Sequence, residues 1–281
     1  MAESDVLKID LDEVIRSRAP KVHRFTPRFL IRSLERLICQ DRMNEMLQAN
    51  RGREGADFCR GVLEHLDIEC DVVGLENLPS ADDESGWRVL FVSNHPLGGL
   101  DGMTLIKFLT EAAPMHDMRF IVNDLLMNIS PLKPVFLPVN TMSGKQSKQA
   151  ALDIDSALAS DIPIAIFPAG LCSRLINGRV QDVAWNKMFV NKAIKYHRDI
   201  IPLHFKGENS GFFYKFAKLR KASGIPVNLE MSLLPREVFR NQGSRFRISI
   251  GSPIGWASLS GGANANAEAQ QIREKVYSLE R

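Results

Sequence analysis

The sequence lacks the features that mark a membrane-spanning, exported or nucleic-acid-binding chain. No apolar run approaches the roughly 18 residues that cross a bilayer. The acidic start Met-Ala-Glu-Ser-Asp has no apolar stretch of a signal peptide behind it. The 36 Lys and Arg against 33 Asp and Glu leave a net charge of only +3, too weak a bias to argue for nucleic acid. We therefore expect a cytoplasmic protein that binds no nucleic acid.

The sequence also lacks a cysteine framework and internal repeats. Its four cysteines (Cys39, Cys59, Cys70 and Cys172) form no Cys-x-x-Cys pair and no metal-ligand spacing. We expect buried free thiols in a reducing compartment, and no metal site.

Short apolar runs alternate with helical patterns along most of the 281 residues, a length that can bury a substantial core. The expected strands are residues 68–73, 89–92, 119–122, 135–139, 162–167, 200–205 and 246–250. Helices are expected between many of them, for example one that Ser143-Gly144-Lys145 opens and one over residues 186–197. This alternation predicts an α/β fold, with a mostly parallel sheet covered by helices.

The pattern divides the chain into three parts. Residues 1–68 form an N-terminal helical segment, residues 69–258 the α/β domain, and residues 259–281 a linker with a terminal helix. Within the first part, residues 27–48 combine apolar residues at helical spacing with several arginines, which predicts amphipathic helices. Packing on the main domain and docking on a membrane surface both explain such helices.

The stretch of residues 87–102 carries the first candidate site. A buried strand stops at Ser93-Asn94-His95, and a Gly-rich turn leads to Asp101 at the start of a helical pattern. His95 and Asp101 are six residues apart and can meet, which would fix the imidazole in one tautomer and leave its other nitrogen to accept a proton. The alternative is that Asp101 only caps the helix and His95 only fills the turn.

A second turn follows the expected strand at residues 162–167. Phe167-Pro168-Ala169-Gly170 presents backbone N–H groups, and Ser173 and Arg174 come directly after it. Because parallel strands end at one edge of a sheet, this turn can lie near His95 and suits an anionic or oxyanionic ligand. A structural turn with a solvated arginine is the alternative.

Together the two motifs resemble the glycerolipid acyltransferase family, the lysophosphatidate acyltransferase-like enzymes. That family carries Asn-His followed by Asp, then Phe-Pro-Glu-Gly-Thr-Arg-Ser, then a strand with a central proline. The matching residues here, in the same order, are Asn94, His95, Asp101, Phe167, Pro168, Gly170, Ser173, Arg174 and Pro202. The resemblance covers roughly residues 70–255.

The sequence departs from the family pattern in the spacing of His95 and Asp101 and at residues that bear on the acceptor, where it lacks cationic partners for a phosphate. Five residues separate His95 from Asp101 where the family usually has four, and Gly98-Gly99 can absorb the extra residue. Ala169 replaces the family's Glu, and Leu171-Cys172 replace its Thr-Arg. Asn140 stands where the family has an arginine that is implicated in holding the acceptor's phosphate. The pattern is thus similar to bacterial acyltransferases, some labelled hemolysin-like, that finish lyso-ornithine or lyso-glycine lipids.

The resemblance implies O-acyl transfer from an acyl thioester to the hydroxyl of a lysolipid. His95 would be the general base and Asp101 its partner. Gly170, Ser173 and Arg174 would stabilise the oxyanion, and Phe167 and Pro168 would border the acceptor. Acyl carrier protein or coenzyme A would carry the acyl group as co-substrate, and no cofactor is implied.

Residues 211–221 mix four aromatic residues with four cations, as segments at a membrane interface do. Phe212, Phe213, Tyr214 and Lys215 would contact the membrane or the acceptor, with the protein peripheral on the inner face of the cell membrane. A core helix with solvated charges is the alternative.

Three other functions remain open. One is a lysophosphatidate acyltransferase of phospholipid synthesis. Another is a lipid-binding protein with degenerate motifs. The third is a hydrolase with Ser93 or Ser173 as nucleophile, although the sequence has no Gly-x-Ser-x-Gly elbow.

Overall fold

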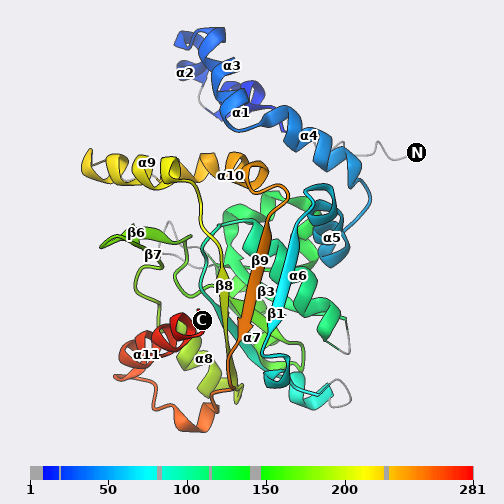
Figure 1. Cartoon of the computed structure of the whole chain (residues 1–281), viewed down its shortest axis with the longest axis vertical. Helices are drawn as coiled ribbons and strands as arrows, with labels where there is room; N and C mark the ends of the chain where they lie inside the picture. Colours follow the sequence, from blue (N-terminus) through cyan, green and yellow to red (C-terminus); the bar gives the residue numbers. More distant parts are fainter. Residues whose placement is uncertain are drawn as a thin grey trace.

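The computed structural model describes residues 9–18, 20–80, 84–113, 116–139, 147–224 and 228–280 (Figure 1). Its strands are β1 (Glu69–Val73), β2 (Leu90–Ser93), β3 (Arg119–Asn123), β4 (Phe136–Val139), β5 (Ile164–Ile166), β6 (Arg174–Ile176), β7 (Arg179–Gln181), β8 (Ile200–Lys206) and β9 (Arg245–Ile250). Its α-helices are α1 (Leu11–Arg18), α2 (Pro20–Phe25), α3 (Arg28–Leu37), α4 (Gln40–Ala49), α5 (Gly55–His65), α6 (Leu100–Ala112), α7 (Lys148–Ala159), α8 (Met188–Tyr196), α9 (Gly211–Ala222), α10 (Leu234–Arg240) and α11 (Ala265–Ser278). Short 3₁₀ segments are η1 (Leu75–Asn77), η2 (Glu84–Trp87), η3 (Asp124–Asn128), η4 (Ser130–Val135), η5 (Leu229–Leu233) and η6 (Trp256–Ser258).

A seven-stranded sheet in the order β1-β9-β8-β2-β5-β3-β4 forms the centre of the molecule. Neighbouring strands are parallel except β8 and β9, which pair antiparallel with Leu203 opposite Ile250. Strands β1 and β9 therefore run against the other five. The predicted α/β fold with a mostly parallel sheet is confirmed.

Helices cover both faces of this sheet, and strand β2 shows how the sequence achieves this. All four of its residues are buried, as expected for a central strand of a parallel sheet. Phe91 belongs to the core that α5 and α6 build on one face, whereas Leu90 and Val92 belong to the core of α7, α8 and α11 on the other. The side-chain alternation of a strand thus feeds two separate cores.

The N-terminal helices α1 to α4 lie outside these layers, beyond α9 and α10 (Figure 1). Helices α3 and α4 occupy the stretch that the sequence marks as amphipathic. The guanidinium of Arg42 lies 4.3 Å over the Phe239 ring of α10 and donates to Gln242 at 2.7 Å. Ile31 of α3 is buried.

A β-hairpin, β6 and β7, departs from the sequence prediction. It is closed by Asn177-Gly178, both with positive φ (51° and 79°), the backbone of a two-residue hairpin turn. Helix α7 begins at Lys148, where the Ser147 hydroxyl caps it by accepting from the Ala150 N–H at 3.0 Å. The predicted start at Ser143-Gly144-Lys145 lies outside the described residues.

Arg198 joins neighbouring segments at one end of the sheet. This end lies opposite to the strand ends that carry the two motifs. The Arg198 side chain is fully buried, and burial lowers its pKa to about 10. The guanidinium donates to five main-chain carbonyl oxygens, those of Val89, Ala157, Leu158, Ser160 and Ile162. One side chain thereby joins the starts of β2 and β5 to the end of α7.

We predict that Arg198→Ala lowers the free energy of unfolding by about 3 kcal/mol, because it removes a buried charged donor from five main-chain carbonyls, of which those of Val89, Ala157 and Ser160 keep a second donor. Urea denaturation followed by circular dichroism measures the loss. Arg88→Ala is the control: the Arg88 side chain is 33% exposed, donates to Ser160 at 3.3 Å, and contributes less than about 1 kcal/mol. Equal losses in the two variants would contradict the assignment.

Candidate active site

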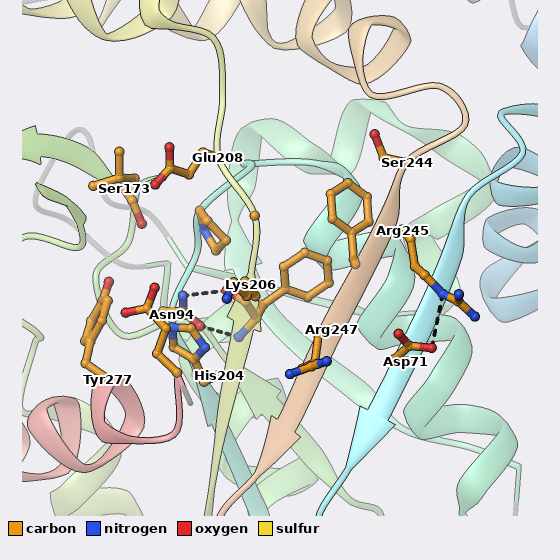
Figure 2. Close-up of a pocket in the computed structure, with 16 residues that line it drawn as sticks. Asp71, Asn94, Ser173, His204, Lys206, Glu208, Ser244, Arg245, Arg247 and Tyr277 are labelled. Carbon is orange, nitrogen blue, oxygen red and sulfur yellow. Dashed lines mark hydrogen bonds and ion pairs between the residues drawn. The ribbon is translucent and has the colours of Figure 1, made fainter.

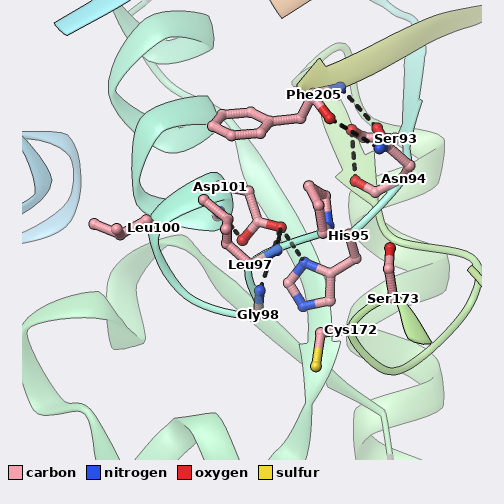
Figure 3. Close-up of polar contacts among 12 residues, drawn as sticks. Ser93, Asn94, His95, Leu97, Gly98, Leu100, Asp101, Cys172, Ser173 and Phe205 are labelled. Carbon is pink, nitrogen blue, oxygen red and sulfur yellow. Dashed lines mark hydrogen bonds and ion pairs between the residues drawn. The ribbon is translucent and has the colours of Figure 1, made fainter. Parts of the chain in front are cut away.

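The order of the strands brings the two predicted motifs together. Strand β2 lies between β5 and β8 and is parallel to both, so their carboxyl ends share one edge of the sheet. The turn after β2 (residues 94–101, the His95 turn) and the turn after β5 (residues 167–174, the Arg174 turn) meet there (Figure 3). The Ser173 N–H donates to the His95 carbonyl at 2.7 Å. The predicted proximity is therefore present.

His95 and Asp101 form a buried pair. Nδ1 of His95 lies 2.9 Å from Oδ2 of Asp101, whose side chain is fully buried. The same Oδ2 accepts the N–H groups of Leu97 at 2.9 Å and Gly98 at 3.3 Å, and Oδ1 accepts that of Gly102 at 2.9 Å. Every donor of this set lies within the His95 turn or next to it, so the carboxylate holds the turn and the imidazole at once (Figure 3).

The fifth residue between His95 and Asp101 is accommodated at Gly98. This residue has a φ of +73°, and a Cβ there would lie 3.0 Å from Cys172 and from Leu234. Gly99 has an extended φ of −159° and precedes α6, which starts at Leu100. Asp101 is thus inside the first turn of α6 and is not its N-cap.

The charges around His95 set its protonation. Burial alone would lower the pKa of His95, but the charge and hydrogen bond of Asp101, with the charge of Asp182, outweigh burial and raise it. For Asp101, burial favours the neutral form, but His95 and the backbone donors prevail and lower the pKa of that carboxyl.

The ring itself is held in one orientation. It stacks on Phe167 with centroids 4.1 Å apart, and its side chain is only 16% exposed. With Nδ1 donating to Asp101, a neutral ring presents Nε2 as a proton acceptor.

All three predicted oxyanion donors have other partners, and Gly170 and Ser173 are engaged within or next to the Arg174 turn. The Gly170 N–H closes the Arg174 turn by donating to the Phe167 carbonyl at 3.0 Å, and Gly170 takes a φ of +69°. The Ser173 hydroxyl donates to Asp182 at 2.5 Å. These groups shape the turn.

Arg174 is held in a buried ion-pair cluster. Its guanidinium donates to the Cys172 carbonyl at 2.6 Å and to Glu230 of η5 at 2.8 Å. Glu230 is fully buried and also accepts from Arg220 of α9 at 2.9 and 3.1 Å. Burial favours the neutral form of Glu230, but the two arginines outweigh it and lower the pKa of its carboxyl. The positive charge of Arg174 is therefore already matched.

The other residues of the predicted motifs support the framework. The side-chain amide of Asn94 donates to the Phe205 carbonyl at 2.9 Å and accepts its N–H at 2.7 Å, which joins the end of β2 to β8. Pro202 sits on β8 opposite Val92. Pro168 is buried in the Arg174 turn and accepts the Asn186 N–H at 3.0 Å.

The four residues that were predicted to contact the membrane or the acceptor lie on helix α9, two of them exposed and two of them buried. Phe212 is 48% exposed and Lys215 is exposed. Phe213 and Tyr214 are buried, and the Tyr214 hydroxyl accepts the Asn209 N–H at 2.9 Å. Only the first pair can reach a surface.

Asp182, directly after β7, is a site residue that the sequence reading missed. It is 1% exposed, and its carboxylate accepts from His95, Ser173 and Trp185. A lone aspartate after an unrecognised hairpin gives no local signal of such contacts.

A cavity of about 540 Å³ borders both turns (Figure 2). Asn94, Pro96 and Ser173 line it on the side of the turns, and His204 and Tyr277 lie close together within it. His95 and Asp101 do not line it. The cavity therefore adjoins residues that support the two turns, and not the His95–Asp101 pair.

The sequence matches the family described as acyltransferase over residues 13–281. Two curated relatives are named lyso-glycine lipid O-acyltransferase. The one from Phocaeicola vulgatus is 39% identical over 279 residues, covering 99% of this chain and 98% of the relative. The one from Bacteroides thetaiotaomicron is 37% identical, covering 99% and 100%. Among solved structures, the 1-acyl-sn-glycerophosphate (LPA) acyltransferase PlsC from Thermotoga maritima aligns with a TM-score of 0.43 and 15% identity, over 90% of this chain and 92% of that one.

We predict that the His95 imidazole titrates above the ordinary histidine value of about 6.5, and that Asp101→Asn moves it below that value. The variant removes the carboxylate charge and leaves the burial, which favours the neutral ring. NMR titration of the ring protons measures both. His204, whose pKa burial lowers, is the internal control and should titrate below about 6.5 in both proteins. A His95 midpoint that stays constant would refute the pairing.

Proposed function

The chain belongs to the acyltransferase family, and from that premise we propose that it moves a fatty acyl group from an acyl thioester to the hydroxyl of a lysolipid. The observation that carries the chemistry is the buried His95–Asp101 contact of 2.9 Å at the end of β2. It supplies a base of fixed orientation, which an alcohol acceptor requires.

In the proposed reaction, Nε2 of His95 takes the proton of the acceptor hydroxyl as its oxygen attacks the thioester carbonyl. The tetrahedral oxyanion then collapses, the carbon–sulfur bond breaks, and the thiolate leaves with the proton that His95 returns. Asp101 holds the ring and stabilises the imidazolium between these steps. No covalent enzyme intermediate and no cofactor are needed.

We assign the stabilisation of the oxyanion to the main-chain N–H of Leu171, which is partly exposed, whereas Cys172 is fully buried. The side chains of Ser173 and Arg174 are engaged with Asp182 and Glu230. Within the described residues the Leu171 N–H donates no hydrogen bond, and the next residue, Cys172, lies directly against Gly98 in the His95 turn. Fixed main-chain donors suit a developing oxyanion because they need no reorganisation.

We propose a monoacylated amino-acid lipid, of the lyso-glycine type, as the acceptor. The names of the two curated relatives support it, and so does Arg174. A phosphate head group binds best to arginines that it can pair with, and Arg174 and Arg220 are already paired with the buried Glu230. The Asn140 position, which also bears on phosphate binding, lies outside the described residues.

The hydrolase alternative has no support in the contacts of the two serines. Ser93 donates to the Asn94 carbonyl at 2.9 Å, and Ser173 donates to Asp182. Both serines are buried, with 2% and 1% exposure. A nucleophilic serine needs its hydroxyl on the base, and both hydroxyls point to other acceptors.

We further propose that the protein works on the inner face of the cell membrane and accepts acyl carrier protein or coenzyme A thioesters. Exposed apolar side chains at the N-terminal helices support the membrane role: Phe25, Phe29, Leu30 and Leu34. Arginines share α3 with three of them. No helix of the described residues is both long and apolar enough to cross a bilayer.

The test of the function is a matrix of labelled donors and acceptors. We expect acyl transfer to lyso-glycine lipid and little or none to lysophosphatidate, with the preferred donor read from acyl carrier protein against coenzyme A thioesters. His95→Ala should lose roughly 100- to 10,000-fold in kcat, the range of a general base.

His65→Ala, at the exposed end of α5, is the matched control and should retain wild-type rates. Transfer to lysophosphatidate alone would overturn the acceptor assignment. Full activity of His95→Ala would overturn the mechanism.

We predict that the double variant Phe25→Ser/Phe29→Ser reduces binding to vesicles of phosphatidylethanolamine and phosphatidylglycerol by about tenfold or more. The two rings are 81% and 66% exposed, and inserting each would contribute on the order of 1–2 kcal/mol. Vesicle flotation measures the bound fraction. Leu152→Ser, which removes a 59%-exposed leucine from α7, is the control and should leave binding unchanged. Equal effects at the two sites would argue against a docking surface at the N-terminal helices.

A further inference from the structure

We propose that Asp182 is a positioning residue for acyl transfer: its buried carboxylate joins the His95 turn to the Arg174 turn and so fixes where the base stands. The inference rests on the proposed function of His95 as the base. Asp182 does not touch the imidazole, so its effect must pass through the backbone of His95.

Three donors from three separate segments converge on this carboxylate. Oδ1 accepts the main-chain N–H of His95 at 3.2 Å and the Ser173 hydroxyl at 2.5 Å. Oδ2 accepts the indole N–H of Trp185 at 2.9 Å. The first donor lies in the His95 turn, the second in the Arg174 turn, and the third before α8. The carboxylate is thus the common acceptor of the two turns.

The main chain of Asp182 is itself fixed from α11. Its N–H donates to the Tyr277 hydroxyl at 2.7 Å, and its carbonyl accepts from Arg273 at 2.6 Å. Arg273 also lies over the Tyr277 ring, 4.9 Å from its centroid. In Figure 2, Tyr277 extends from α11 toward Ser173. Helix α11 therefore anchors the carboxylate, and the carboxylate anchors the turns.

A hydrogen bond that only stabilised the fold would not require a charged acceptor at position 182. Burying one is costly unless donors compensate, and here burial raises the pKa of Asp182 while its three donors lower it again in part. The link between Ser173 N–H and the His95 carbonyl already joins the two turns once. The second link is the hydrogen bond from the His95 N–H to Asp182, and it acts on the main chain of the base itself. Displacing a base by about 1 Å can cost roughly 100-fold in rate.

The negative charge of Asp182 also reaches the imidazole. The charged groups around His95 are Asp101 from α6, Asp182 after β7 and Arg174 on β6. Both carboxylates favour the imidazolium, and Arg174 opposes it. Removing the charge of Asp182 should therefore lower the pKa of His95. The neutral base would then persist to lower pH.

The test is Asp182→Asn, measured by kcat, both KM values and the pH profile of kcat/KM. We expect kcat to fall roughly 10- to 100-fold while each KM stays within about twofold, and the acid limb of the profile to move to lower pH. A residue that only stabilised the fold would reduce the active fraction and leave the acid limb in place. An acid limb that does not move, with or without a fall in kcat, would overturn the inference.

Asp199→Asn is the matched control. Asp199 is half-buried and accepts the Trp256 N–H at 3.0 Å, just before β8 at the far end of the sheet from His95. We expect wild-type kcat and an unmoved acid limb in this variant.

If Asp182→Asn does not fold, Tyr277→Phe takes over the test, because it removes the phenol oxygen that anchors Asp182 and retains the ring. We expect a several-fold loss in kcat with unchanged KM values. Wild-type kcat in this variant would overturn the inference. Failure of the wild-type protein to transfer any acyl group would instead refute the proposed function, so the two failures are distinguishable.

Discussion

The hydrogen bond between His95 and the buried Asp101 is the contact on which the rest of the site depends. A fully buried carboxylate is stable only when donors surround it. Here the donors are the imidazole and the N–H groups of Leu97, Gly98 and Gly102. Satisfying this one carboxylate therefore dictates the path of residues 94–101 and the tautomer of the ring. The His95 imidazole is oriented by the same interaction that folds its turn.

Much of this could be predicted from the sequence because the signals are local. Apolar runs bounded by turn residues gave the seven strands of the main sheet, and their alternation with helical patterns gave a parallel arrangement. His95 and Asp101 are six residues apart, close enough that a Gly-rich turn decides their contact. The hairpin at Asn177-Gly178 carried an equally local signal, the Asn-Gly pair, which the strand assignment overlooked.

The remainder could not be predicted because it depends on partners distant in the chain. Asp182 is 87 residues from His95, and Glu230 is 56 residues from Arg174. In the sequence, Asp182 and Glu230 are two charged residues among many, and such residues are ordinarily expected to be exposed to solvent. Only the closed fold reveals that both are buried and saturated with donors. For the same reason the sequence offered Arg174 and Ser173 as free oxyanion donors, whereas their side chains have other partners.

These two distant carboxylates determine which groups of the Arg174 turn are free to bind a ligand. Asp182 engages the Ser173 hydroxyl, and Glu230 engages the Arg174 guanidinium, so both polar side chains of the turn serve its shape. In the proposed reaction, stabilisation of the oxyanion then falls to the main chain, which the turn holds in place. In the proposed reaction, the head group of the acceptor would meet an Arg174 guanidinium that is already paired with Glu230. A turn built in this way supplies geometry and dipoles in place of net charge, which suits an acceptor without a phosphate.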